Sequence, residues 1–119
     1  MKIKKSVLVV EDDRSIQSTI RLLLESENFT VYVADHGRDG LDMLRRMDSP
    51  CVVLLDIQME VMDGYEFLHE KNADPSIAAI PVVILSATAN AKDLRGAQEF
   101  IKKPFEIPDL LDAVGRYCG

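Results

Sequence analysis

The stretch VVLLD at residues 52–56 decides how the rest of the chain is interpreted. Its first four side chains are branched and apolar, which is typical of a strand that is buried on both faces of a parallel sheet. The run ends abruptly on an acid. Because ligands of open α/β sheets bind beyond the carboxyl ends of the strands, Asp56 is the first candidate site residue.

Two further runs have the same character, VLVV at residues 7–10 and VVIL at residues 82–85. Two weaker segments, TVYV at 30–33 and FIK at 100–102, mix polar and apolar residues and suit the edges of a sheet. Helical periodicity fills the gaps, for example over residues 16–24. The alternation predicts an α/β fold with a doubly wound, five-stranded parallel sheet of the flavodoxin-like type. The predicted strand order is 2-1-3-4-5, which places both weak strands at edges.

The length and the net charge of the chain limit the functions that it can have. The chain has 119 residues and a net charge of −6, so we expect one domain over residues 1–119. Direct binding of nucleic acid is not expected, because the dense basic run is confined to Lys2, Lys4 and Lys5. No apolar run is long enough to cross a membrane, and the opening apolar run meets acids too early for a signal peptide. The expected location is therefore the cytoplasm.

The two cysteines, Cys51 and Cys118, lie far apart in the sequence. Neither belongs to a C-x-x-C pair, and no secretory signal suggests oxidising surroundings. We therefore expect both to be small buried or terminal hydrophobic residues rather than a disulfide.

Polar residues follow four of the predicted strands. Glu11 and Asp12 come after the first, Asp56 after the third, Ser86 after the fourth and Lys103 after the fifth. These strands are neighbours in the predicted order, so their carboxyl-end residues should converge. Clustered carboxylates repel one another unless a cation joins them, and ligands that are all oxygens favour Mg²⁺ over zinc. The next acid, Asp13, is expected to mark a helix N-terminus instead.

A metal beside a carboxylate, a hydroxyl and an ammonium suits phosphoryl transfer, which needs positioning and charge neutralisation. Asp56 is a competent nucleophile for forming an aspartyl phosphate. Mg²⁺, Lys103 and the Ser86 hydroxyl could each hold one phosphoryl oxygen. Before phosphorylation we expect Lys103 to pair with Asp56.

Four motifs carry a resemblance to a known family. They are VVEDD at residues 9–13, LLDIQMEVMDG at 54–64, LSA at 85–87 and FIKKPF at 100–105. Each motif alone is weak, but four in this order are specific. The chain resembles the receiver domain of bacterial response regulators, the phosphoproteins of two-component signalling.

The resemblance implies a role for each matching position of the metal site. Asp56 matches the phosphoacceptor. Glu11 and Asp12 match the acidic pair, of which Asp12 would bind the metal directly. Gln58 would offer its backbone carbonyl as a further ligand. In the family the cofactor of this reaction is Mg²⁺.

The resemblance also implies how a phosphoryl group is received. Ser86 matches the hydroxyl residue, Lys103 the lysine before proline, and Phe100 the switch aromatic. The donor would be a sensor histidine kinase or a histidine phosphotransfer protein. The protein would be a switch that assists its own phosphorylation and dephosphorylation rather than an enzyme. A receiver with no attached output domain would act through contact with other proteins, and the sequence does not name its target.

Two departures from the family pattern are visible. Glu60 stands where the family usually has proline. The stretch between Ser86 and Lys103 is short by a helical turn or more. Within residues 87–96, only Ala91 to Arg95 could form a short helix, so we predict a truncated fourth helix.

Other functions fit less well. A receiver-like interaction module that is never phosphorylated remains an alternative, although the complete set of site residues argues against it. A flavodoxin needs a phosphate-cradling loop after the first strand, where Glu11 and Asp12 would repel phosphate. A haloacid-dehalogenase-type phosphatase would need an aspartate at the position of Gln58.

Overall fold

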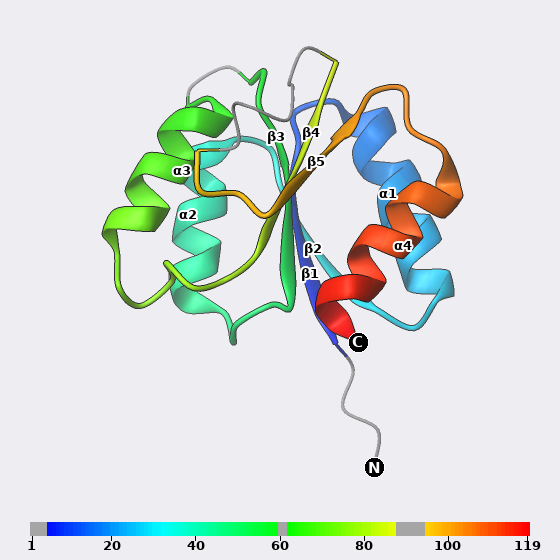
Figure 1. The fold of residues 1–119 in the computed structure, drawn as a ribbon, viewed down its shortest axis with the longest axis horizontal. Helices are drawn as coiled ribbons and strands as arrows, with labels where there is room; N and C mark the ends of the chain where they lie inside the picture. The colour runs from blue at the N-terminus through cyan, green and yellow to red at the C-terminus, as the bar shows by residue number, and fades with distance from the viewer. Residues whose placement is uncertain (1–4, 60–61, 88–94) are drawn as a thin grey trace.

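A computed structural model describes residues 5–59, 62–87 and 95–119 (Figure 1). Strands and helices alternate along most of the chain. In order, the elements are β1 (Ser6–Val10), α1 (Arg14–Ser26), β2 (Thr30–Ala34), α2 (Gly37–Arg46), β3 (Val52–Asp56), α3 (Gly64–Ala73), β4 (Val82–Ser86), β5 (Glu99–Lys102) and α4 (Ile107–Cys118).

The five strands form one parallel sheet in the order β2-β1-β3-β4-β5, which confirms the predicted fold class and topology. The register aligns the strand ends that matter for the site. Val10 lies opposite Leu55, Asp56 opposite Leu85, and Ser86 opposite Lys102. The carboxyl ends of β1, β3, β4 and β5 therefore meet along one edge of the sheet.

Helices cover both faces of the sheet. Figure 1 shows α2 and α3 on one side and α1 and α4 on the other. Val53 and Leu55 pack under α2 and α3, whereas Val52 and Leu54 pack under α1 and α4. All four side chains have no exposed surface, as expected for a strand that is apolar on both faces.

Helix α2 packs closely on the sheet at Gly40. A Cβ atom there would lie 2.8 Å from Cγ2 of Val10 and 3.2 Å from Cε2 of Phe67. The missing side chain lets α2 approach both β1 and α3. This close approach fixes the β1 end that carries the acids.

The expectation that the cysteines are unpaired was wrong. Cys51, just before β3, forms a disulfide with Cys118, the last residue of α4, and their Cα atoms are 5.2 Å apart. The two residues are 67 apart in the sequence. The fold brings them together because α4 runs back along the sheet and ends beside its amino edge, where Figure 1 places the C-terminus.

Two other predictions concern residues that the structure does not describe. Glu60 and most of the shortened segment, residues 88–94, lie outside the described ranges. The predicted truncated helix at Ala91 to Arg95 stays a prediction. Where the chain is described again, Arg95 and Gly96 have positive φ angles of 46° and 90°.

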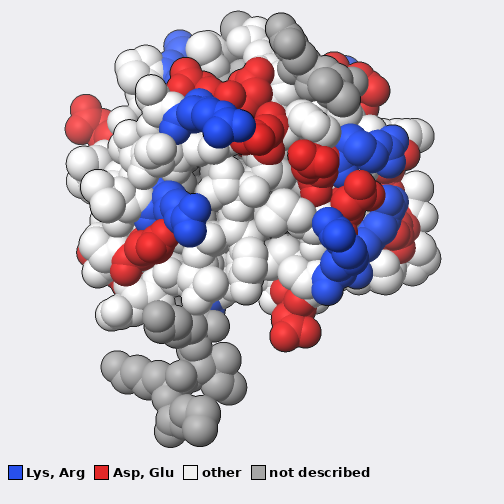
Figure 2. All heavy atoms as spheres, turned by 180° about the vertical axis from the view of Figure 1, so that it is seen from behind, with Lys and Arg blue, Asp and Glu red and all other residues white. Residues whose placement is uncertain are grey.

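Surface charge is mixed on the face seen in Figure 2. Acidic and basic side chains alternate there, and the described residues show no continuous basic patch on that face. Within the described residues, no helix has both the length and the apolar character needed to cross a membrane.

Candidate functional site

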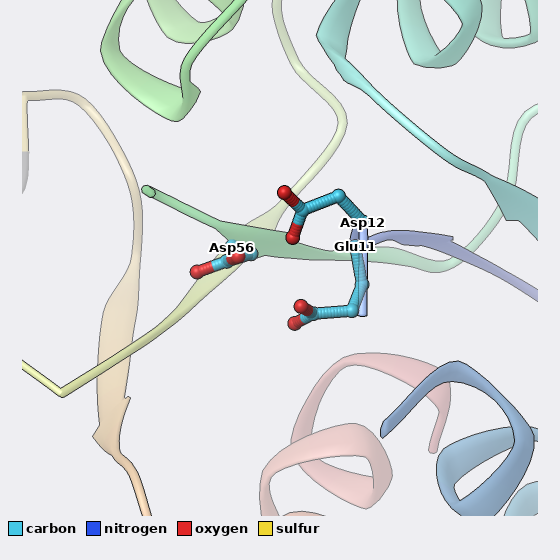
Figure 3. A group of neighbouring side chains, drawn as sticks. All are labelled: Glu11, Asp12 and Asp56. Carbon is cyan, nitrogen blue, oxygen red and sulfur yellow. The ribbon is translucent and has the colours of Figure 1, made fainter. Parts of the chain in front are cut away.

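Three carboxylates converge at the carboxyl edge of the sheet. Glu11 and Asp12 follow β1, and Asp56 is the last residue of β3. One oxygen from each lies within 4.8 Å of the others. Figure 3 shows the carboxylates of Glu11 and Asp12 turned toward that of Asp56. The arrangement holds oxygen donors only, at a spacing that one hard cation such as Mg²⁺ could bridge.

The three carboxylates differ in their exposure to solvent, and this difference limits the role that each can take. Glu11 and Asp56 are only 1% and 4% exposed, whereas Asp12 is exposed. Asp12 therefore faces the direction from which an ion or a phosphodonor can arrive. Asp56 also accepts a hydrogen bond of 3.3 Å from the backbone N–H of Gln58, which orients its Oδ1 atom.

Lys103 lies between the two buried acids. Its Nζ atom is 2.8 Å from Oε2 of Glu11 and 3.5 Å from Oδ1 of Asp56. The expected pairing of Lys103 with Asp56 is thus present, but Glu11 is the closer partner. Because Glu11 is closer, the Lys103 ammonium neutralises the Asp56 carboxylate only in part.

The electrostatics of the site follow from this burial. Burial raises the pKa of Glu11 from 4.5 to about 7, and the nearby charge of Asp56 adds to the rise while Lys103 opposes it. Burial likewise raises the pKa of Asp56, against the lowering effect of Lys103. The pKa of Lys103 is lowered by burial, but the hydrogen bond to Glu11 and the charge of Asp56 outweigh this and raise it overall. The cluster therefore favours an added cation, because one lysine does not offset two buried acids.

Ser86 and Phe100 lie on β4 and β5, the two strands beyond β3. Ser86 ends β4 and is buried, and its backbone carbonyl accepts a hydrogen bond of 2.9 Å from the N–H of Lys103. Phe100, on β5, is half-buried against the core under α2 and α3. This backbone hydrogen bond holds Lys103 at the edge of the sheet, from which its side chain reaches Glu11.

The loop after Asp56 returns to the site through Gly64. Its N–H donates to the carbonyl of Ile57 at 3.0 Å. A Cβ atom at Gly64 would lie 2.8 Å from the carbonyl oxygen of Asp56 and 2.7 Å from Cα of Ile57. Any larger residue would push the N-terminus of α3 away from the phosphoacceptor candidate.

The Asp13 carboxylate is not part of the cluster, as predicted, although the Asp13 backbone N–H donates to Oε1 of Glu11 at 3.2 Å. Its carboxylate accepts hydrogen bonds from the N–H groups of Ser15 and Ile16 at 2.9 and 3.2 Å and caps α1. The cap fixes where α1 begins and hence the path of the chain after Asp12.

Sequence reasoning missed Gln17. Its side-chain amide donates to the backbone carbonyl of Glu11 and to Oδ1 of Asp35, the latter at 2.8 Å. These bonds join α1 to the ends of β1 and β2, beside the acids. The one signal in the sequence is a polar residue within an amphipathic helix, and such residues are usually exposed.

The comparisons with known proteins agree with this geometry. Residues 7–115 match the family described as the response regulator receiver domain. The cell cycle response regulator CtrA of Brucella ovis is 37% identical over 110 residues, which cover 88% of this chain and 46% of that protein. The same protein of Brucella abortus matches equally. The chain thus spans about half the length of these curated relatives.

Solved structures show the same likeness. The receiver domain of a sensor histidine kinase from Pseudomonas aeruginosa PAO1, whose structure has a magnesium ion in the active site cleft, has a TM-score of 0.89 and 25% identity, covering 98% of this chain and 99% of that one. A receiver domain protein of Methanospirillum hungatei JF-1, described as CheY-like, has a TM-score of 0.85 and 28% identity, covering 98% and 96%. Receiver domains of this family bind Mg²⁺ at an acidic pocket, and the chain has an acidic cluster of Glu11, Asp12 and Asp56. The match over nearly the whole chain shows that it belongs to the response regulator receiver family of two-component signalling.

Proposed function

We propose that this chain is a phosphorylation-controlled switch that receives a phosphoryl group on Asp56 in a Mg²⁺-dependent reaction. The observation that carries the proposal is the arrangement of charges around this one carboxylate. Asp56 ends β3 within reach of two further acids, and the Lys103 ammonium lies 3.5 Å from its Oδ1 atom. Neither a flavodoxin nor a receiver-like module that is not phosphorylated would use all of these groups at once.

The reaction assigned to Asp56 is a phosphoryl transfer. A carboxylate oxygen of Asp56 attacks phosphorus, the bond from phosphorus to the donor nitrogen breaks, and the donor imidazole keeps the electron pair and takes up a proton. The product is an acyl phosphate on Asp56. Burial of this side chain limits the access of bulk water to the new mixed anhydride.

The neighbouring residues supply charge. Asp12 and Asp56, with the backbone carbonyl of Gln58, would hold Mg²⁺, while Glu11 completes the acidic surroundings. The bound ion would neutralise developing charge on the phosphoryl oxygens. Lys103 moves its ammonium from the carboxylates toward a phosphoryl oxygen, and the Ser86 hydroxyl donates to another. Phe100 then turns toward the side that Ser86 leaves, which changes the surface of β5.

The donor is proposed to be a phosphohistidine on a sensor histidine kinase or on a histidine phosphotransfer protein. Aspartate phosphorylation from such donors is what the family membership supports, since receivers accept phosphoryl groups in two-component signalling. The downstream partner is proposed to be a protein that recognises the altered surface.

Intact-mass spectrometry tests the proposal. The protein is incubated with acetyl phosphate and Mg²⁺, and one phosphoryl group per chain is expected. Asp56→Asn should remain unlabelled. Asp13→Asn is the matched control, because Asn keeps the cap on α1 and removes an acid that lies outside the cluster.

Two outcomes would contradict the proposal. Labelling of Asp56→Asn at the wild-type level would move the acceptor elsewhere. A wild-type chain that stays unlabelled with acetyl phosphate and with small phosphoramidates would instead support the alternative, a receiver-like interaction module that is not phosphorylated.

A further inference from the structure

The chain has two cysteines, and the fold places both at the amino end of the sheet, away from the acids. Cys51 precedes β3 and Cys118 ends α4. Their Cα atoms are 5.2 Å apart, well within the range that a disulfide spans without backbone movement. A pair 67 residues apart reaches this distance only because β3 and α4 are packed together.

The surroundings suit the reduced form as well as the disulfide. The backbone carbonyl of Ser6 lies 3.2 Å from Sγ of Cys51, so a thiol there has an acceptor for its proton. Cys118 is 4% exposed and packs in the core under α1 and α4, where a thiol behaves as a small hydrophobic residue. We therefore expect the reduced chain to keep the same fold.

Cys51 is the more exposed of the two cysteines. Cys51 is half-buried and lines a surface cavity of about 600 Å³ together with Lys5, Ser6, Thr30 and Tyr32. The Lys5 ammonium, which also contacts the backbone carbonyl of Cys118, and the Asp48 carboxylate both line the cavity, so the lining carries one charge of each sign. A small disulfide that carries both carboxylate and ammonium groups fits this cavity in size and charge.

We propose that Cys51 and Cys118 form a thiol–disulfide exchange site that is oxidised by a low-molecular-weight disulfide bearing carboxylate and ammonium groups and reduced by the corresponding thiol. The site is separate from the acidic cluster and does not depend on phosphorylation.

The exchange takes place in two steps. The Cys51 thiolate attacks one sulfur of the small disulfide, its S–S bond breaks, and one small thiolate leaves and takes up a proton. Cys118, deprotonated in turn, attacks the Cys51 sulfur of the mixed disulfide and releases the second small thiol. In sum, two protein thiols and one small disulfide give the protein disulfide and two small thiols.

Access and charge assign the first step to Cys51. Cys118 is nearly buried at the C-terminus of α4, where the negative end of the helix dipole disfavours a thiolate. Cys51 lies before a strand and beside the cavity. The small disulfide therefore enters at Cys51, and Cys118 resolves the mixed disulfide.

Exchange with glutathione tests the site in the intact protein. Wild-type protein is equilibrated over a series of ratios of reduced to oxidised glutathione, quenched with acid, alkylated in denaturant and weighed intact. We expect the protein to stay monomeric. The number of alkylated thiols per chain should fall from two to none as the proportion of oxidised glutathione increases. Two alkylated thiols at every ratio, or a disulfide that survives a large excess of the reduced form, would overturn the proposal.

Single variants test the order of the steps. Cys118→Ser should accumulate a mixed disulfide with glutathione at Cys51, roughly tenfold faster than Cys51→Ser does at Cys118. Equal rates, or a faster reaction at Cys118, would overturn the assignment of Cys51 as the point of entry. The wild-type titration needs no substitution, so it decides the existence of the site even if a variant folds poorly.

Discussion

At its carboxyl end, β3 carries Asp56 among Glu11, Asp12 and Lys103, whereas at its amino end it is preceded by Cys51, which is bonded to Cys118. The first region gathers like charges at the edge of the sheet. The second joins a strand to a helix by a covalent bond. The same short apolar strand connects them.

The acidic cluster lowers the stability of the fold, whereas the disulfide raises it. The acids repel one another and are partly withdrawn from water, which disfavours the folded chain in the absence of a cation. The disulfide restricts the unfolded chain and favours the folded one. Substitutions at the two ends should therefore change stability in opposite directions.

The largest effect is expected at the amino end. Replacing both Cys51 and Cys118 by serine should lower the free energy of unfolding by about 2 to 4 kcal/mol relative to the oxidised wild type, because a loop of 67 residues is no longer closed. Urea unfolding followed by circular dichroism measures the change. Reduced wild type is the control and should behave like the double variant. If oxidised and reduced wild type unfold at the same urea concentration, the disulfide contributes no stability.

At the carboxyl end, Glu11→Gln should have the opposite sign. The pKa of Glu11 is raised to about 7 in the folded protein from an ordinary value of 4.5, so the folded state binds a proton more tightly than the unfolded chain. Stability is therefore lost as the pH rises from about 4.5 to about 7, and the full penalty remains above that range. Glu11→Gln in metal-free buffer should be more stable at pH 8 by on the order of 2 kcal/mol.

The measurement is urea unfolding at pH 5 and pH 8 with a chelator present. Between pH 8 and pH 5, the free energy of unfolding should increase more for the wild type than for Glu11→Gln. Glu27→Gln serves as the matched control, because Glu27 is exposed at the end of α1, away from the acids. A variant that is less stable than wild type at pH 8 would mean that the bond from Lys103 to Glu11 outweighs the cost of burying the acid.

The third expected effect is smaller and separates two adjacent acids. Asp12→Ala should barely change stability without metal, since Asp12 is exposed, but should abolish the stabilisation by Mg²⁺. At several times the dissociation constant, that stabilisation is about 1 kcal/mol in the wild type. Asp13→Ala should show the reverse: a loss of about 1 kcal/mol from the α1 cap and an unchanged Mg²⁺ response.

Thermal melts of both variants with and without Mg²⁺ give the crossed comparison. An Mg²⁺-induced shift that survives in Asp12→Ala would remove this carboxylate from the metal site. A shift that vanishes in both variants would indicate that the start of α1, rather than the Asp12 side chain, controls the ion.

The carboxyl end could be predicted from the sequence because each residue there is tied to the end of a strand. Once the apolar runs fixed the strands and their order, the positions of Glu11, Asp56, Ser86 and Lys103 followed from the topology. The strand boundaries shifted by no more than one residue, so that Asp56 ends β3 and Ser86 ends β4 instead of following them. That shift leaves the site unchanged.

The amino end could not be predicted in the same way. The approach of Cys51 to Cys118 depends on how far α4 runs back along the sheet, which no local pattern specifies. Buried polar residues on helices were missed for a similar reason. Lys71 of α3 is 2% exposed, donates from Nζ to the carbonyl of Ala78 at 2.8 Å, and has its pKa lowered by burial. A lysine at that position in a helix is expected to be solvated.

The smallest expected effect is the coupling between the two ends. Cys51 and Asp56 are five residues apart along an extended strand, which puts their Cα atoms roughly 16 Å apart. Sites at this distance without shared partners usually contribute additively, within about 0.5 kcal/mol. Glu11→Gln should therefore stabilise reduced and oxidised protein equally, and the Mg²⁺-induced shift should not depend on the oxidation state.

The four unfolding curves of wild type and Glu11→Gln, each oxidised and reduced, measure the coupling directly. A coupling well above 0.5 kcal/mol would mean that β3 and α4 transmit strain along the sheet. The two ends would then form one switch with two inputs instead of two independent sites.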